Sequence, residues 1–260
     1  MGEIKFSHYF YSIFYMEYVI KEGQTLSEIS NLFNIPIKDL CLINNISNPN
    51  VIKVGQILIL SDLLGKDNIK EKIDKFINFI ESKKIKRTLS SVAKESIELI
   101  FHKCLEFDVT DLRMVSYILA TTHWETGAYG QKFIYEPISE QGKGKGLSYG
   151  IPHKKTGKTY YGRGFVQITW FDNYERFTKL LYSIKINADL VNKPELALNP
   201  EIASIILVLG MKTGKFTGSD LFDYFSASKS DYYNARRIVN GLDKAVIIAD
   251  IAKEIHYIIK

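Results

Sequence analysis

The sequence predicts a mainly α-helical protein that begins with a small unit of two strands and two helices. Apolar residues recur at helical spacing through most of the 260-residue chain, and the strand-like runs lie near residues 18–20 and 54–60. The composition, 46% hydrophobic and 24% charged, is typical of a globular protein. The length suits one large domain, or one medium and one small domain.

The cysteines and the apolar runs exclude several classes of protein. Cys41 and Cys104 fall in different predicted domains, which argues against a disulfide framework. No cluster of cysteine and histidine has metal-ligand spacing, so we expect no zinc site, no other metal and no cofactor. No apolar run approaches the roughly 18–20 residues of a membrane-spanning helix, so we expect no membrane insertion.

The charge is positive and unevenly placed. A net charge of +5 favours an anionic partner, nucleic acid or a bacterial wall with its teichoic acids, without choosing between them. Between residues 142 and 163 there are six Lys/Arg and no Asp or Glu. They are Lys143, Lys145, Lys154, Lys155, Lys158 and Arg163. This segment is either a solvated loop or a surface that attracts an acidic polymer.

Residues 1–16 form an N-terminal extension. The stretch from Phe6 to Met16 is apolar and aromatic, but Lys5 is its only basic flank and no small-residue cleavage site follows. We therefore expect a protein made in the cytoplasm without a secretory signal. Met16 is an alternative start, because the first recognisable unit begins just after it.

Residues 17–61 are predicted to form a compact strand–helix–helix–strand unit. A short strand covers 18–20, and Thr25 caps the next helix with Glu28 three residues later. Pro36 starts a second helix, and the run 54–60 closes the unit as a strand.

This segment resembles a LysM module over its whole length. The matching residues are Tyr18, Val19, Gly23, Thr25, Leu26, Ile29, Leu40, Asn44, Ile52, Gly55, Gln56 and Leu58. The resemblance implies binding of glycans that contain N-acetylglucosamine, in a groove formed by Gly23, Thr25, Leu26, Asn50 and Ile52. The alternative is that these residues only build the fold. Gln24 stands where the family often has Asp.

Residues 62–87 are predicted to be a helical linker. Apolar residues at positions 69, 73, 76, 77 and 80 lie on one face, with lysines and acids on the others. We expect this helix to dock on the next domain, with a basic hinge at 83–87.

The remainder, residues 88–260, is predicted to be a second, mainly helical domain. Apolar residues mark helices over 92–104 and 115–122, the second capped by Thr110. Further helices are expected over 203–209, ended by Gly210, and over 230–239, ended by Asn240-Gly241. Residues 142–159 are rich in glycine and lysine and read as a long irregular loop.

Two glutamates stand out in this domain. Glu125 closes the helix that contains residues 115–122, next to Trp124, where burial would help a carboxyl keep its proton. Glu140 follows in a polar loop. Glycosidic hydrolysis needs one carboxyl that holds its proton and one that stays ionised. A structural carboxylate at a helix end is the alternative for Glu125.

Residues 111–253 resemble the catalytic domain of glycoside hydrolase family 19, which includes chitinases and endolysins. The matching blocks are residues 116–127, 135–142, 161–169, 173–174, 189–191, 210–211, 214–218 and 235–241. The resemblance implies a lysozyme-like α-helical catalytic domain behind the βααβ LysM domain.

The resemblance also implies roles for individual residues. Glu125 would be the general acid and Glu140 the general base, with Thr169 helping to hold the attacking water. The reaction would invert the anomeric carbon, with the carboxyls about 6.5–9.5 Å apart. The implied substrate-binding residues are Gln167, Asn173, Tyr174, Asn240 and Arg163, the last of which either binds substrate or braces the base.

The chain departs from the plant enzymes of this family in two ways. Trp124 stands where they have His, although His123 is adjacent. Only 15 positions separate Glu125 from Glu140 (140 − 125), and Glu136 lies nearby as an alternative base. Gln167 and Tyr174 are alternatively internal braces.

The sequence thus predicts a monomeric cell-wall glycan hydrolase of the endolysin type. LysM would hold it on peptidoglycan, and the second domain would cut β-1,4 linkages at the wall after release from the producing cell. The partner would be this glycan rather than nucleic acid. Alternatives are a chitinase, a non-catalytic glycan-binding protein, and a lytic transglycosylase that needs no base.

Overall fold

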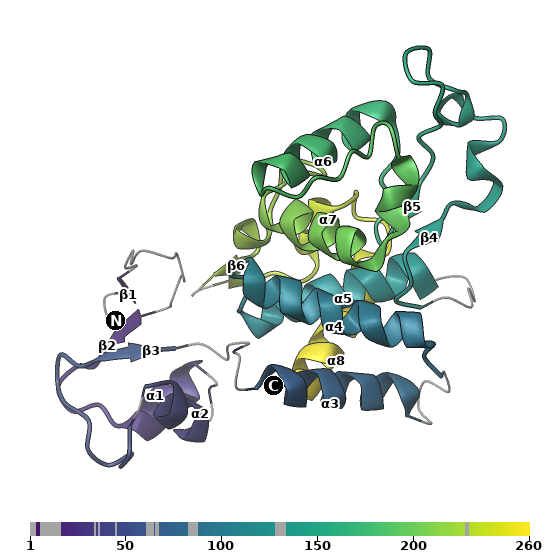
Figure 1. Cartoon of the computed structure of the whole chain (residues 1–260). Helices are drawn as coiled ribbons and strands as arrows, with labels where there is room; N and C mark the ends of the chain where they lie inside the picture. Colours follow the sequence, from purple (N-terminus) through teal and green to yellow (C-terminus); the bar gives the residue numbers. More distant parts are fainter. Residues whose placement is uncertain are drawn as a thin grey trace. The chain divides into compact units, whose positions relative to one another are not determined.

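The computed structural model divides the chain into two compact units, Met1–Leu64 and Gly65–Lys260 (Figure 1). The structure describes residues 4–5, 17–33, 35, 37–44, 46–60, 65, 68–82, 88–127, 134–226 and 229–260. The apolar stretch 6–16 and the proposed hinge 83–87 lie outside the described residues.

The first unit is a three-stranded antiparallel sheet with two helices, in the strand order β1-β2-β3. Its elements are β1 (Ile4–Lys5), β2 (Glu17–Val19), α1 (Leu26–Phe33), α2 (Ile37–Ile43) and β3 (Ile57–Ile59). The predicted βααβ order is confirmed. Strand β1 was not predicted; it comes from the N-terminal extension and pairs Ile4 with Tyr18.

The turn into α1 shows why this unit was predictable from local sequence. Gly23 has φ +78°, a conformation that favours glycine. Thr25 Oγ1 accepts a hydrogen bond from the Glu28 N–H at 3.2 Å, and the Glu28 carboxylate accepts one from the Thr25 N–H at 2.9 Å. This reciprocal pair is the predicted capping box.

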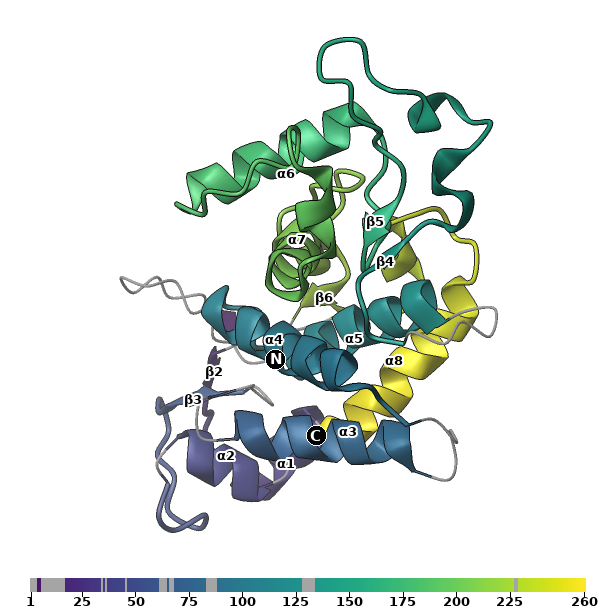
Figure 2. The same ribbon diagram turned by 45° about the vertical axis from the view of Figure 1, so that its right-hand side comes forward.

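The second unit is built from helices, with two short strand pairings, β4 with β5 and β6 with β7, between them (Figure 2). Its helices are α3 (Ile69–Glu81), α4 (Ser91–Glu106), α5 (Leu112–Gly127), α6 (Phe171–Ser183), α7 (Pro200–Lys212) and α8 (Ala245–Ile259). Its strands are β4 (Ile138–Ser139), β5 (Arg163–Gly164), β6 (Phe225–Ser226) and β7 (Lys229–Ser230). None of the helices among the described residues is long and apolar enough to cross a membrane.

Helix α5 is central to this unit and packs against α8, α4 and α7. Most of its residues are buried, including hydroxyls that would be costly to bury without partners. Ser116 Oγ donates to the Leu112 carbonyl at 2.6 Å, and Thr122 Oγ1 donates to the Ile118 carbonyl at 2.9 Å. The packing therefore fixes the C-terminal end of α5, where Glu125 lies.

Helix α3 is a structural part of the second unit and packs on α8 and α4. Ile73, Phe76 and Ile80 are buried, as the apolar stripe predicts. Lys72 is also buried, and its Nζ donates to the Ile259 carbonyl at 2.8 Å. A cation there complements the negative end of the α8 dipole.

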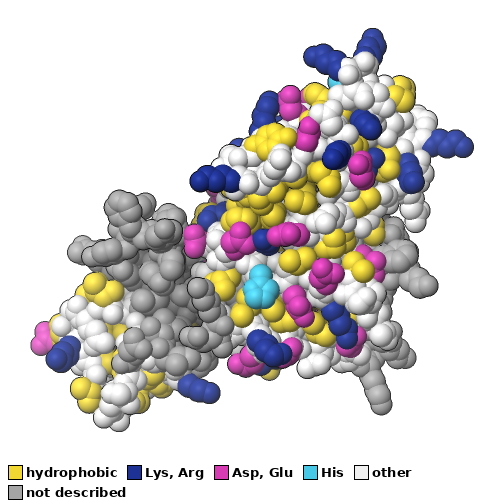
Figure 3. Space-filling model, viewed as in Figure 1, with side chains coloured by type: hydrophobic (Ala, Val, Ile, Leu, Met, Phe, Trp, Pro, Cys, Tyr) yellow, Lys and Arg dark blue, Asp and Glu magenta, His cyan; other side chains and the backbone are white. Residues whose placement is uncertain are grey.

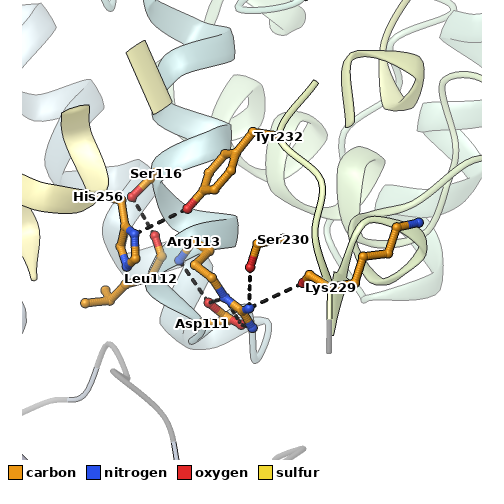
Figure 4. Close-up of polar contacts among 8 residues, drawn as sticks. All are labelled: Asp111, Leu112, Arg113, Ser116, Lys229, Ser230, Tyr232 and His256. Carbon is orange, nitrogen blue, oxygen red and sulfur yellow. Dashed lines mark hydrogen bonds and ion pairs between the residues drawn. The ribbon is translucent and has the colours of Figure 1, made fainter. Parts of the chain in front are cut away.

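The start of α5 differs from the prediction (Figure 4). The helix begins at Leu112, so the preceding residue is Asp111 and not Thr110. The Asp111 carboxylate accepts the Arg113 N–H at 2.9 Å and also pairs with its guanidinium. Arg113 Nη1 donates a hydrogen bond to Ser230 Oγ at 2.7 Å, which connects the start of α5 to β7. Asp111, two residues before Arg113, therefore caps this helix in place of the predicted Thr110.

Two predicted helices have different ends or do not form. Gly210 does not end α7, which continues to Lys212. A Cβ at Gly210 would lie 2.4 Å from the Phe216 ring, so this glycine serves close packing. The segment 230–239 is not one helix, because Ser230 pairs in β7 and only a short 3₁₀ turn, Asn234–Ile238, follows.

Candidate active site

Glu125 lies in the last turn of α5 and pairs with an arginine from a distant part of the chain. Arg236 Nη1 is 2.7 Å from Glu125 Oε1, and its Nε donates to the Asp243 carbonyl at 3.1 Å. The side chain of Arg236 is 3% exposed and that of Glu125 is 20% exposed. The immediate neighbour of this carboxyl is thus a cation, which stabilises its charge.

No role for Arg236 was predicted from the sequence. The available signal was its place in the 235–241 block, which carries part of the family resemblance.

Glu140 follows β4, and each of its two carboxylate oxygens accepts a hydrogen bond. Its Oε2 accepts the Gly162 N–H at 3.0 Å, while its own N–H donates to the Gly162 carbonyl at 2.8 Å. Its Oε1 accepts the Tyr149 hydroxyl at 2.7 Å. This bond raises the pKa of Tyr149, so the phenol stays protonated and remains a donor.

Gly162 makes room for this arrangement. A Cβ at this position would lie 2.9 Å from Gln167 Oε1 and 3.4 Å from Glu140 Cβ. A side chain would therefore push apart the turn and the carboxylate that its backbone binds. Close approach, rather than contact with a ligand, explains this glycine.

Glu136, the alternative base, lies in a different setting. Its carboxylate accepts a hydrogen bond from Ser90 Oγ. The same Ser90 caps α4 by accepting the Ala93 N–H at 3.0 Å. A carboxylate near the N-terminus of a helix is stabilised by the helix dipole, so Glu136 has a structural role without catalysis.

The chain returns to the end of α5 shortly before Glu140. Tyr135 N–H donates to Thr126 Oγ1 at 2.8 Å, next to Glu125. The five residues from there to Glu140 span at most about 18 Å when fully extended. Figures 1 and 2 both show β4 beside the C-terminal half of α5. The two glutamates therefore belong to one region of the unit.

Arg163 and Tyr174 are both buried, Arg163 in the turn that precedes α6 and Tyr174 in its first turn. They are 5% and 0% exposed. Arg163 Nη1 donates to the Tyr174 hydroxyl at 2.8 Å, and its guanidinium carbon lies 3.6 Å from the centre of the Tyr161 ring. Burial raises the pKa of Tyr174 to about 12, with Arg163 opposing that shift. Their burial favours the alternative given for each, that they brace the turn from inside.

Gln167, Thr169 and Asn173 form a chain of hydrogen bonds along the same turn. Gln167 Nε2 donates to the Ile138 carbonyl at 2.9 Å, which links the turn to β4. Thr169 Oγ1 donates to the Gln167 carbonyl at 2.8 Å, and Asn173 Nδ2 donates to the Thr169 carbonyl at 2.7 Å. All three side chains are half-buried. Asn240, by contrast, is exposed, and its side chain accepts the Gly241 N–H.

In the first unit, the five residues of the expected glycan groove are in unequal positions. Leu26 is 2% exposed and packs in the core, so its side chain cannot contact a ligand. Ile52 is half-buried against the same core, and Thr25 is engaged in the cap. Gly23 and Asn50 are exposed.

The loop 142–159 contains two short 3₁₀ turns and is otherwise irregular, as predicted. Its five lysines are exposed, and none forms an ion pair with a carboxylate of the described residues. They are Lys143, Lys145, Lys154, Lys155 and Lys158. Figure 3 shows Lys and Arg side chains at the upper end of the second unit, where the ribbon places this loop. Arg163 is buried and does not belong to this surface.

Comparison with known proteins identifies the first unit. The LysM domain family matches residues 18–61, and the chain contains a LysM domain there. Over 44 residues it is 48% identical to the N-acetylmuramoyl-L-alanine amidase XlyA of Bacillus subtilis (strain 168). That similarity covers 17% of this chain and 15% of the amidase, so it concerns only a small part of each protein.

Solved structures similar to the chain are chitinases. Chitinase C from Streptomyces griseus HUT6037 is 14% identical, with a TM-score of 0.41 and 82% of each chain covered. A mutant of chitinase C is 18% identical, with a TM-score of 0.37, covering 75% of this chain and 83% of the other. A bacterial family 19 chitinase is 18% identical, with a TM-score of 0.26, and the match covers 72% of this chain and 85% of the chitinase. These TM-scores are low, so the similarity assigns no function to the chain.

Proposed function

We propose that this protein is a cell-wall glycan hydrolase that cleaves β-1,4 linkages by an inverting mechanism with Glu125 as acid and Glu140 as base. The observation that carries the proposal is the pair of oriented carboxylates. Glu125 is fixed by a buried arginine at the end of α5, and Glu140 is held through both oxygens by Tyr149 and Gly162. Inverting glycosidases use two carboxyl groups in these distinct roles.

Arg236 gives the acid step a physical basis. When Glu125 transfers its proton to the leaving oxygen, it becomes a carboxylate, and the guanidinium 2.7 Å away stabilises the charge that develops.

Glu140 would act from the opposite face of the sugar. Two donors fix its carboxylate, so it can accept a proton from water without first reorienting. Thr169 Oγ1 donates to the Gln167 carbonyl, and Asn173 Nδ2 donates to the Thr169 carbonyl. These bonds set the position of the Thr169 hydroxyl, whose oxygen would accept a hydrogen bond from the attacking water.

Peptidoglycan is the proposed polymer, and the LysM domain supports this choice. Its relative XlyA is named for cleavage next to a muramoyl group, and the resemblance extends through the whole domain. Attachment to the polymer would raise the local substrate concentration for the second unit. Chitin is the second candidate, since it too contains the N-acetylglucosamine that a LysM domain is expected to bind.

Digestion of purified peptidoglycan and of colloidal chitin, followed by mass spectrometry, tests the proposal. We compare wild type with Glu125→Gln and Glu140→Gln, and use Glu136→Gln as the matched control. Hydrated reducing-end fragments from peptidoglycan, lost in both variants and retained in the control, are expected. Release from chitin alone would change the substrate. Anhydro products would indicate a transglycosylase, and bound but uncut polymer a binding protein.

A further inference from the structure

Trp170 occupies a position where tryptophan is unusual, both for its backbone conformation and for its place before a helix. It directly precedes α6 with φ +74° and ψ 144°, a conformation that residues with a Cβ rarely adopt. Small polar residues that bond the helix N–H groups are preferred there, and Trp170 makes no such bond. Neither the helix start nor the backbone angle explains a tryptophan.

The backbone holds Trp170 in this conformation from two sides. Its N–H donates to the Tyr160 carbonyl at 2.8 Å, which ends the lysine-rich loop. Its carbonyl accepts the N–H groups of Asn173 and Tyr174 in the first turn of α6. The indole is 50% exposed, so the arrangement presents a large apolar ring at the surface. Strained residues of this kind concentrate at functional sites.

A second aromatic ring connects Trp170 to Glu140. The Tyr149 ring meets Trp170 edge-on, with centroids 5.1 Å apart and planes at 77°. The Tyr149 hydroxyl donates to Glu140 Oε1 at 2.7 Å. Trp170 is thus one side chain removed from the proposed base and directly follows Thr169.

Pyranose rings carry a face of C–H groups that packs well on an aromatic ring, while their hydroxyls stay in water. We propose that Trp170 is a stacking surface for a sugar ring of the glycan on the Glu140 side of the scissile bond, supported at its edge by Tyr149. The inference rests on the proposed function and adds a binding position to it. The ligand class is a β-1,4-linked N-acetylhexosamine chain.

Tryptophan fluorescence tests this contact directly. The chain has 2 tryptophans and none lies within the LysM domain, so in Trp124→Phe/Glu125→Gln the signal comes from Trp170 alone and the glycan is not cut. The probes are the N-acetylglucosamine hexamer and soluble peptidoglycan strands freed of peptides. We expect at least one probe to reduce acrylamide quenching by about half. Unchanged quenching with both probes would overturn the proposal.

Kinetics separates a sugar contact from mere support of Tyr149. Trp170→Ala should raise KM about tenfold and change kcat by less than about twofold, whereas Trp170→Phe should keep most of the affinity. Tyr182→Ala, an exposed aromatic on α6, is the control and should behave as wild type. A lower kcat with unchanged KM would mean that Trp170 acts only through Tyr149, and the stacking role would be wrong. Failure of wild type to cut any glycan would refute the proposed function instead, while the fluorescence result would still stand.

Discussion

Replacing Arg236 tests whether the Glu125 pair organises the site. Arg236→Met keeps most of the apolar volume and leaves Glu125 without its cation. Breaking a buried ion pair costs about 3–5 kcal/mol. Because Glu125 is 20% exposed and can recruit water, we expect a loss of about 2–3 kcal/mol. For a unit of this size, that corresponds to about 5–10 °C in Tm.

Tryptophan fluorescence during urea unfolding is the assay, since both tryptophans lie in the second unit. Arg237→Met is the matched control, because the neighbouring side chain is exposed, and it should change stability by less than about 0.5 kcal/mol. The double variant Arg236→Met/Glu125→Gln should recover part of the loss, because no charge is then left unpaired. A loss below about 0.5 kcal/mol in Arg236→Met would refute the reasoning.

Three further predictions concern the base, its turn and the end of α8. Tyr149→Phe keeps the ring but removes the donor to Glu140, so kcat should fall about tenfold with little change in KM; an unchanged kcat would exclude a role for the hydroxyl. Gly162→Ala should lower kcat about tenfold or more, because the new methyl meets Gln167 at 2.9 Å and displaces the turn, whereas Gly65→Ala, whose methyl would meet only Asn68 Oδ1 at 3.9 Å, should not. Burial lowers the pKa of His256 from 6.5 to about 4. The unfolded chain therefore binds more protons, and stability should fall as pH drops from 6.5 towards 4, by about 1–2 kcal/mol after allowing for partial exposure. Urea unfolding at pH 7.5 and 5.0 should show a smaller difference for His256→Gln, and an equal difference would contradict the assignment.

The features predicted correctly from sequence are those that depend on neighbouring residues. The capping box of Thr25 and Glu28 involves positions three apart, and the apolar stripe of α3 repeats within one helix. The position of Glu125 at the end of α5 follows from the same kind of pattern.

The features that were missed depend on residues far apart in the chain. The partner of Glu125 is 111 positions away, and nothing in the local sequence of Arg236 distinguishes it from the exposed Arg237. The sequence left open whether Arg163 binds substrate or acts as a brace, because its burial depends on Tyr174 from α6. Gly210 was predicted to end a helix because glycine is common there, but its role is to allow close packing of the Phe216 ring.

The anomeric form of the first product tests the central claim most directly. Wild type would be given the soluble glycan that it cleaves, and the new reducing end would be followed by NMR before mutarotation is complete. Two carboxylates acting on opposite faces of the sugar predict the α-anomer from a β-1,4 linkage. The β-anomer, or an anhydro sugar, would contradict a mechanism in which Glu140 activates water.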